Sequence, residues 1–245
     1  MLSPFESDRL CVVLVAPRNP LNIGAAARAM SNFGFLHLRV VNPYEVAFRN
    51  ARSAVGAEPL LLEAVEYPSV AEAIADCSLV VGTTAVGGRQ LQQPCFSLDE
   101  AAGDIRERLA NERVAVLFGS EKSGLAKETL SHCHQLLRIP TRTEHRSMNL
   151  GQAVAVTLYA IARLGTAKPE RPADVPTNAA SAGEIERLHG VLMEVLAASG
   201  YVHPDTQAGV EEKVRSLLLR LETSSTDAEL LLGMMRQIQW KLTRS

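Results

Sequence analysis

Three short runs of apolar, mostly β-branched residues constrain the fold of this chain more than any other feature. They are Leu10–Ala16, Leu79–Gly82 and Val114–Phe118. A run without polar alternation is typical of a strand buried on both faces, as in a parallel sheet covered by helices. Two further runs, His37–Val41 and Leu136–Ile139, extend the pattern. The sequence therefore predicts an α/β fold built on a parallel sheet.

The segments between these runs have the character of helices. Helices are expected over residues 25–33 and 46–55, after Ser69, and from Ser97 to Leu109. Ser69 with Glu72, and Ser97 with Glu100, form capping-box patterns that open two of them. Alternation of strand and helix predicts helices on both faces of the sheet.

The segment from Leu150 to Leu164 is predicted to be one more helix, and a buried one. It is rich in Ala and Leu, lacks proline, and carries apolar side chains on nearly every side. With about 15 residues it is shorter than the roughly 20 that a membrane span requires. The polar loop of residues 140–149 leads into it, and such a loop beside a buried helix can hold a ligand.

The chain changes character after this helix. Residues 165–181 contain three prolines and no apolar periodicity, which predicts a linker. Amphipathic helices are expected over roughly 183–199, 208–221 and 227–241, with capping boxes at Ser181–Glu184 and Thr226–Glu229 and a stop at Gly200. The predicted division is a domain over 1–164, a linker over 165–181 and a small helical domain over 182–245.

Composition limits the functional classes. The net charge of −2 gives no global electrostatic reason for nucleic-acid binding, so any such case must be local. Four separated cysteines without a CxxC pair, at 11, 77, 95 and 133, are expected to be free buried thiols in a reducing compartment. The N-terminus lacks the basic and apolar regions of a signal peptide, so a cytoplasmic protein is expected.

Three loops that leave predicted strands carry unusual residues: 17–24, 119–124 and 140–149. Because ligands of parallel sheets collect at the carboxyl ends of the strands, the loops are expected to converge. Asn22 suits a helix N-cap, and Arg28 would point back towards the strand end, although a plain surface arginine is equally compatible. Neither the first loop nor the second has the dinucleotide-binding or Walker A glycine pattern.

Two other stretches are weaker candidates. Thr83-Thr84-Ala85 ends a strand with small and polar residues, which suits either a polar ligand or a flexible connection. The triplet His132-Cys133-His134 resembles metal ligands, but neighbouring residues on a helix point apart and do not readily share one ion. No metal site is expected.

Taken together, the three loops resemble the three motifs of the SPOUT superfamily of RNA methyltransferases. The matching residues, in chain order, are Asn22-x-Gly24-x-x-x-Arg28, Phe118-Gly119-x-Glu121-x-x-Gly124-Leu125, and Ile139-Pro140 with Ser147-Met148-Asn149-Leu150. The similarity covers essentially the full length. It is greatest to members that methylate the ribose 2′-hydroxyl of cytidine or uridine in the anticodon loop of tRNA.

The resemblance implies an α/β domain with a C-terminal trefoil knot, although general topology rules would discard a knot. It also implies a homodimer whose active sites are completed across the interface, with no membrane partner. The cofactor would be S-adenosylmethionine, held mainly by the backbone of seven residues: Thr83, Thr84, Ala85, Gly119, Ile139, Ser147 and Met148.

By the same resemblance, Arg28 is the catalytic residue. A guanidinium stays protonated in proteins, so gripping a phosphate and stabilising the 2′-oxyanion suit it better than proton abstraction. Asn22 and Glu121 would fix Arg28 or the substrate sugar. Ser147 or Asn149 would position the hydroxyl.

RNA binding would come from local charge. Arg28 and the loop residues Arg142, His145 and Arg146 are the candidates, with Arg138 in the same cluster. Arg49, Arg52 and Arg89 are expected near the same rim. An ordinary solvated loop is the alternative. In the tail, Lys213, Arg215 and Arg220 either share one helix face or the tail mainly supports a dimer.

Other functions stay open on the sequence alone. The catalytic motifs fit a methyltransferase acting on ribosomal RNA as well as one acting on tRNA. A knotted RNA-binding relative without turnover is a further alternative, which retention of Asn22, Arg28, Glu121 and Ser147 argues against. A dehydrogenase would need the glycine fingerprint that is absent.

Overall fold

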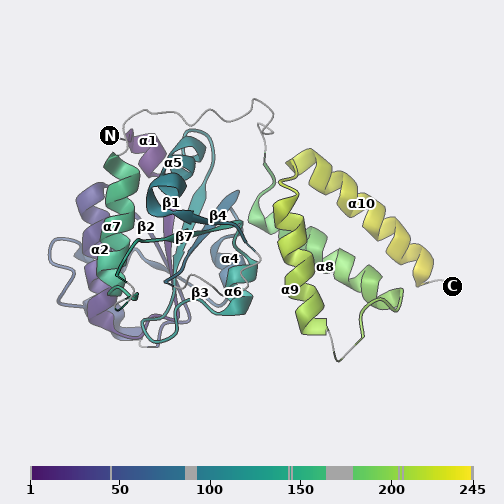
Figure 1. The fold of residues 1–245 in the computed structure, drawn as a ribbon, viewed down its shortest axis with the longest axis horizontal. Helices are drawn as coiled ribbons and strands as arrows, with labels where there is room; N and C mark the ends of the chain where they lie inside the picture. Colours follow the sequence, from purple (N-terminus) through teal and green to yellow (C-terminus); the bar gives the residue numbers. More distant parts are fainter. Residues whose placement is uncertain are drawn as a thin grey trace.

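The computed structural model describes residues 2–44, 46–85, 93–142, 144, 146–163, 179–203, 205 and 207–243. Within them, a seven-stranded sheet has the order β3-β2-β1-β6-β4-β7-β5, and every pairing is parallel (Figure 1). The strands are β1 Leu10–Val15, β2 His37–Val41, β3 Val65–Tyr67, β4 Leu79–Thr83, β5 Cys95–Ser97, β6 Val114–Phe118 and β7 Gln135–Arg138. The predicted α/β class is confirmed.

The sequence missed the two edge strands, β3 and β5. Each is three residues long and largely exposed, so neither produces an apolar run. The central strands β1 and β6 are buried almost throughout, which explains why their runs were visible. An apolar run in the sequence therefore identifies only those strands that are buried on both faces.

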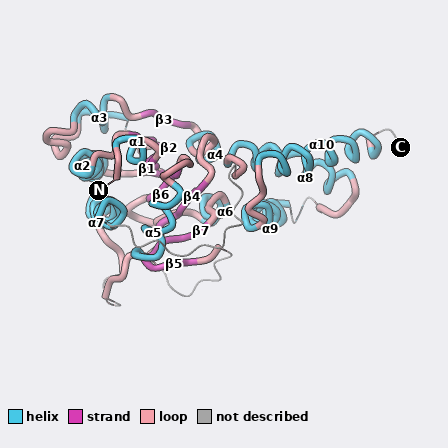
Figure 2. The backbone as a smooth tube through the Cα atoms, turned by 90° about the horizontal axis from the view of Figure 1, so that it is seen from above, coloured by secondary structure: helices cyan, strands magenta, loops and turns pink. Residues whose placement is uncertain are grey.

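Helices cover both faces of the sheet (Figure 2). One apolar core joins Leu10, Val12 and Leu14 of β1 to α2 (Pro20–Phe33), α3 (Glu58–Leu62), α5 (Leu98–Arg108) and α7 (Leu150–Arg163). The opposite core joins Cys11 and Val13 to α4 (Val70–Ala73) and the region of α6 (Lys127–Ser131). The chain opens with the short helix α1 (Pro4–Ser7), and the 3-10 helix η1 (Val46–Asn50) replaces most of the longer helix expected there.

Helix α2 begins earlier than predicted. Asn19 is its N-cap, since its side chain accepts from the backbone N–H of Leu21, and Pro20 occupies the first turn. The prediction that Asn22 caps the helix is therefore wrong. Asn22 lies in the first turn, and Arg28 lies about two turns from the helix start.

Within the single chain, helix α7 is buried on one side only, so burial of its other side stays a prediction that depends on a second copy. Gly151 packs against α2 so closely that an added Cβ would lie 2.7 Å from the Cβ of Ala25. On the other side, Val156 and Tyr159 are 36% and 48% exposed. The predicted last residue, Leu164, lies outside the described residues.

Three tail helices have an apolar core of their own. They are α8 Ala182–Ala198, α9 Gln207–Arg220 and α10 Ser225–Leu242. Ser181 and Glu184 form the predicted capping box, and Gly200 has the left-handed conformation of a helix stop. The capping box predicted for the last helix, Thr226 with Glu229, is wrong. Ser224 is the N-cap of α10, and its side chain accepts from the backbone N–H of Asp227. Residues 164–178, most of the predicted linker, lie outside the described residues.

The tail helices dock on the side of the sheet that carries α4 and α6 (Figure 1). The backbone N–H groups of Ala182 and Gly183 donate to the carbonyls of Cys77 and Ala75, at 2.7 and 2.9 Å. Arg215 of α9 donates to the Ser131 hydroxyl at 3.1 Å and pairs with Glu186 at 3.0 Å. Arg215 is thus engaged in holding helices together.

The sequence also led to expectations about the cysteines, metal ligands and membrane-spanning helices. In the described ranges, Cys11, Cys77 and Cys133 are free and buried, while Cys95 is free but exposed, contrary to the prediction of burial. No cluster of three or more potential metal-binding side chains occurs within those ranges. No helix found there combines the length and the apolarity needed to cross a membrane.

Candidate functional site

A pocket of about 260 Å³ opens at the carboxyl ends of β4, β6 and β7. Its walls come from the loops that follow these strands and from the first turns of α7. All seven residues expected to hold the cofactor are among the lining residues: Thr83, Thr84, Ala85, Gly119, Ile139, Ser147 and Met148. Segments 83–85, 119–124 and 139–148 therefore meet at one pocket, whereas the first predicted loop, residues 17–24, supplies no lining residue.

The loop after β6 requires glycine at both of its ends. A Cβ on Gly119 would lie 2.1 Å from the carbonyl carbon of Gly124, so no other residue fits there. Gly124 has a φ of +68° and donates its N–H to the carbonyl of Ser120 at 2.8 Å. This tight turn exposes backbone to the pocket and presents Glu121.

Glu121 ties the second loop to the first. Its carboxylate accepts from the backbone N–H groups of Arg18 and Asn19, at 2.9 and 3.1 Å, and from the side-chain amide of Asn22 at 2.9 Å. Burial favours the protonated carboxyl, but these hydrogen bonds outweigh it and hold the pKa of Glu121 below its usual value. The carboxylate is therefore charged at neutral pH and already saturated with donors.

Asn149 ties the third loop to the same network. Its side-chain N–H donates to the side-chain oxygen of Asn22 at 2.9 Å. Its own side-chain oxygen accepts from the backbone N–H of Gly151 at 3.0 Å, which caps the start of α7. A chain of hydrogen bonds from Glu121 through Asn22 to Asn149 thus fixes the three loops relative to one another.

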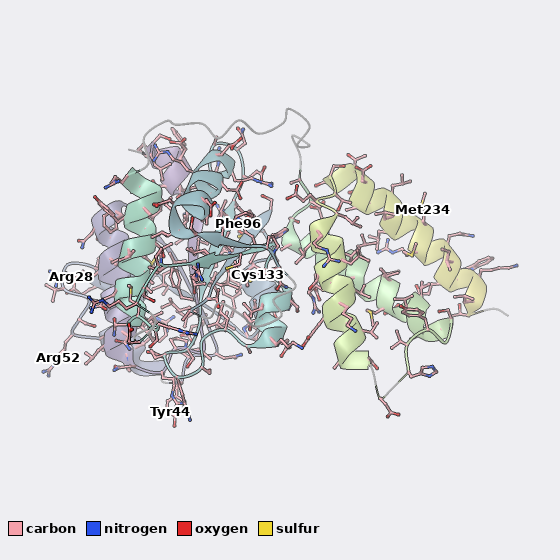
Figure 3. All side chains as sticks on the ribbon, in the orientation of Figure 1. Arg28, Tyr44, Arg52, Phe96, Cys133 and Met234 are labelled. Atoms are coloured by element: carbon pink, nitrogen blue, oxygen red, sulfur yellow. The ribbon has the colours of Figure 1, made fainter. Side chains whose placement is uncertain are left out.

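Arg28 and Ser147 are the two predicted catalytic side chains outside this network. Ser147 lines the pocket and is exposed. Arg28 does not line the pocket of its own chain, and it projects from the outer side of α2 (Figure 3). Among the described residues, neither side chain has a hydrogen-bond or ion-pair partner, so both are available to a ligand.

The predicted basic rim is only partly assembled. Arg146 lines the pocket, and Arg138 and Arg142 are exposed nearby in sequence. Arg52 is exposed on the same side of the molecule as Arg28 (Figure 3). Arg49, in contrast, pairs with Glu66 and donates to the Ala64 carbonyl, so it is tied to the fold. His145 and Arg89 lie outside the described residues.

Sequence reasoning missed the part played by the first loop's backbone. The N–H groups of Arg18 and Asn19 hold Glu121, about a hundred residues away, and no local pattern announces such a contact. It also missed Tyr44, whose ring lies 4.9 Å from the guanidinium of Arg18. The Asn19-Pro20 pair, an N-cap followed by a first-turn proline, was the available signal for the true start of α2.

Comparison with known proteins agrees with the resemblance found in the motifs. The SpoU rRNA Methylase family matches residues 9–159. A relative from Escherichia coli (strain K12), named tRNA (cytidine/uridine-2'-O-)-methyltransferase TrmJ, is 33% identical over 232 residues, covering 93% of this chain and 94% of its own. The TrmJ of Cronobacter sakazakii is 32% identical over 233 residues, covering 93% and 95%. The crystal structure of TrmJ from Z. mobilis ZM4 matches with a TM-score of 0.82 at 32% identity, covering 94% of this chain and 98% of that one.

Proposed function

The chain belongs to the SpoU rRNA Methylase family, and from that premise we propose that it transfers a methyl group from S-adenosylmethionine to the ribose 2′-hydroxyl of a cytidine or uridine in tRNA. The observation that carries the choice of tRNA is the extent of the match. The family region ends at residue 159, whereas the similarity to the TrmJ proteins spans 93% of the chain and so includes tail helices.

The lining of the pocket suits this cofactor. Leu130, Ile139 and Met148 offer apolar surface for a flat ring, and the glycine turn at 119–124 offers backbone groups for polar atoms. When bound, S-adenosylmethionine supplies a methyl group on an already activated sulfonium. The protein then has to align the ribose hydroxyl and stabilise the charge that develops on its oxygen.

The catalytic roles follow from which side chains are free. Arg28 grips a phosphate and stabilises the developing 2′-oxyanion, because its guanidinium has no partner among the described residues. Ser147 orients the hydroxyl from the pocket wall. Glu121, Asn22 and Asn149 are committed to one another, so they hold the loops in register around the substrate.

The active site is completed across a homodimer. Support comes from Arg28, which is exposed and lies outside the pocket of its own chain. Exposed apolar side chains on α2 and α7, among them Leu21 and Tyr159, offer a surface for a second copy. In this arrangement the partner's Arg28 serves the pocket, and the stretch of residues 137–164 forms the knot.

The remaining parts take supporting roles. Arg142, His145 and Arg146 contact RNA phosphates beside the pocket, where Arg146 is a lining residue. Residues 1–164 form the catalytic domain and 182–245 a helical domain, which has a separate apolar core. The target nucleotide lies in the anticodon loop, and the enzyme works in the cytoplasm, where tRNA is modified.

One experiment tests the reaction directly. Purified protein, S-adenosylmethionine and tRNA transcripts are incubated, and the digested nucleosides are analysed by mass spectrometry for 2′-O-methylcytidine and 2′-O-methyluridine. The matched substrate carries a 2′-deoxynucleotide at the modified position, which must abolish product if the ribose oxygen is the acceptor. Methylated base, or transfer to ribosomal RNA but not to tRNA, would contradict the proposal.

A further inference from the structure

The loops that follow β1 and β2 are joined in a strained arrangement beside the pocket. Each strand is followed by a non-glycine residue in the left-handed region, Ala16 at φ +48° and Asn42 at φ +46°. Asparagine tolerates this region, but alanine rarely adopts it, and such strain concentrates at functional sites. The backbone N–H of Ala16 donates to the carbonyl of Val41 at 2.8 Å, and the backbone N–H of Tyr44 donates to the carbonyl of Pro17 at 3.1 Å. The two loops are therefore held as one unit.

This unit displays an aromatic ring and a cation together. Tyr44 is 70% exposed, and the guanidinium of Arg18 lies 4.9 Å from its ring centroid. Tyr44 projects from the edge of the molecule into solvent (Figure 3). A single exposed aromatic side chain is ordinary on a protein surface. This ring extends from a backbone held by the Pro17 carbonyl and lies against an arginine, an arrangement suited to receiving a flat group.

The position of the pair connects it to the pocket. The backbone N–H of Arg18 donates to Glu121 at 2.9 Å, and Glu121 is a lining residue. The Arg18 backbone therefore lies beside a lining residue, and its guanidinium lies against the Tyr44 ring. Any RNA that brings a ribose into the pocket must lay neighbouring nucleotides on the surrounding surface.

We propose that Tyr44 and Arg18 form a stacking platform for an unpaired nucleobase that flanks the methylated nucleotide. The inference rests on the proposed function, because it assigns a subsite of the same RNA. Proteins hold splayed bases of single-stranded RNA loops by stacking them on aromatic rings and on arginine planes. Every base has a flat face, so the platform selects an unstacked loop rather than a particular base.

The first test compares substitutions at position 44. Tyr44→Ala should lower kcat/KM for tRNA between about 5-fold and 150-fold, the range expected when one stacked base loses its ring. Tyr44→Phe keeps the ring and should stay within about twofold of wild type. The control is Phe5→Ala, which removes a 79% exposed aromatic ring from α1, before the amino end of β1. Calorimetry with S-adenosylmethionine should give the same affinity for all variants, because neither side chain lines the pocket.

The second test identifies the ligand as a base. Transcripts carry a single abasic nucleotide at each position flanking the methylated one. At one of these positions, wild-type kcat/KM should fall to the level of Tyr44→Ala on intact RNA, and Tyr44→Ala should lose nothing further. A Tyr44→Ala penalty that persists on every abasic transcript would overturn the proposal in favour of a phosphate contact.

Other outcomes also decide the matter. Unchanged kcat/KM in Tyr44→Ala, with an active wild-type enzyme, overturns the platform and leaves the proposed function standing. Sedimentation of Tyr44→Ala as a smaller species than wild type would instead assign the ring to contact with a second copy. A wild-type enzyme that methylates no tRNA fails the proposed function itself, whatever the variants do.

Discussion

At the scale of single residues, Glu121 holds the loops around the pocket together, because its carboxylate accepts hydrogen bonds from Arg18, Asn19 and Asn22. All seven cofactor candidates line one pocket, because motif residues mark strand ends that a parallel sheet brings together. The contacts of Glu121 with the backbone of Arg18 and Asn19 were invisible, since they join residues far apart in the chain. The roles of Arg28 and Ser147 stay predictions.

Arg28→Ala tests the catalytic role. Methyl transfer should fall by about 10²–10³-fold or more, the loss typical of removing one donor to a developing oxyanion. Affinity for S-adenosylmethionine should not change, because the proposed partners of Arg28 are a phosphate and the ribose oxygen of the RNA rather than the cofactor. Tritium transfer to tRNA and calorimetry measure the two quantities.

Arg52→Ala is the matched control for Arg28→Ala. Arg52 is another exposed arginine on the same side of the molecule, so its loss should weaken RNA binding mildly without abolishing turnover (Figure 3). Equal losses in the two variants would mean that Arg28 contributes only general charge. Full activity in Arg28→Ala would remove it from the mechanism.

At the scale of helices and strands, buried elements were predicted and marginal ones were not. The central strands could be predicted from apolar runs, as for β6, and long helices from capping boxes, as for α5. β3 and β5 escaped because three exposed residues carry no periodicity. The exposed side of α7 also escaped, because an apolar side chain does not reveal whether a partner covers it.

Gly151→Ala tests the close packing of α2 against α7. The new methyl group would meet the Cβ of Ala25 at 2.7 Å, so the helices must separate. A loss of about 1–3 kcal/mol in the free energy of unfolding is expected for such overpacking. Urea denaturation measures it.

Gly190→Ala provides the control for Gly151→Ala, because it makes the same change inside α8, where nothing lies within 4 Å. It should stabilise the protein by up to about 1 kcal/mol through helix propensity. If both variants shift the unfolding midpoint in the same direction, packing at Gly151 is not limiting.

Two histidines at the junction of α6 and β7 predict a pH dependence of stability. Burial, reinforced by Arg215, lowers the pKa of His132 to about 4, and burial with Arg108 lowers the pKa of His134 to about 4. An unfolded histidine titrates near 6.5, so between these values the unfolded chain binds more protons than the folded one. The contribution of these histidines to stability should therefore be fully present above pH ~6.5 and should be lost progressively as pH falls towards 4.

Urea midpoints between pH 7 and pH 4 measure this slope. The double variant His132→Gln/His134→Gln should show a shallower decline than wild type, since two proton-binding groups of the unfolded chain are gone. Identical slopes would assign the acid sensitivity to the carboxylates instead.

At the scale of the whole molecule, the sequence predicted an α/β domain and a small helical domain, and the structure adds the contacts between them. Arg215, counted from the sequence as a candidate for RNA, pairs with Glu186 and donates to Ser131 of α6. Local sequence patterns such as capping boxes and apolar runs do not reveal an ion pair between two different helices. The knot and the homodimer stay predictions that follow from the family.

Mixed dimers test whether active sites are shared between chains. Arg28→Ala disables the contributed guanidinium, and Glu121→Gln weakens the loops of the pocket that receives it. If each site combines Arg28 of one chain with the pocket of the other, a mixed dimer regains one intact site. Random exchange of equal amounts should restore roughly a quarter of wild-type activity. No recovery after verified exchange would confine each site to a single chain.

The short helix α6 lies between the pocket and the tail helices and contacts both. Leu130 lines the pocket, while the adjacent Ser131 accepts a hydrogen bond from Arg215 in the tail. One turn of backbone thus contacts both the tail and the pocket. If displacing the tail shifts this turn, tail displacement and donor binding must change one another's equilibrium by the same factor.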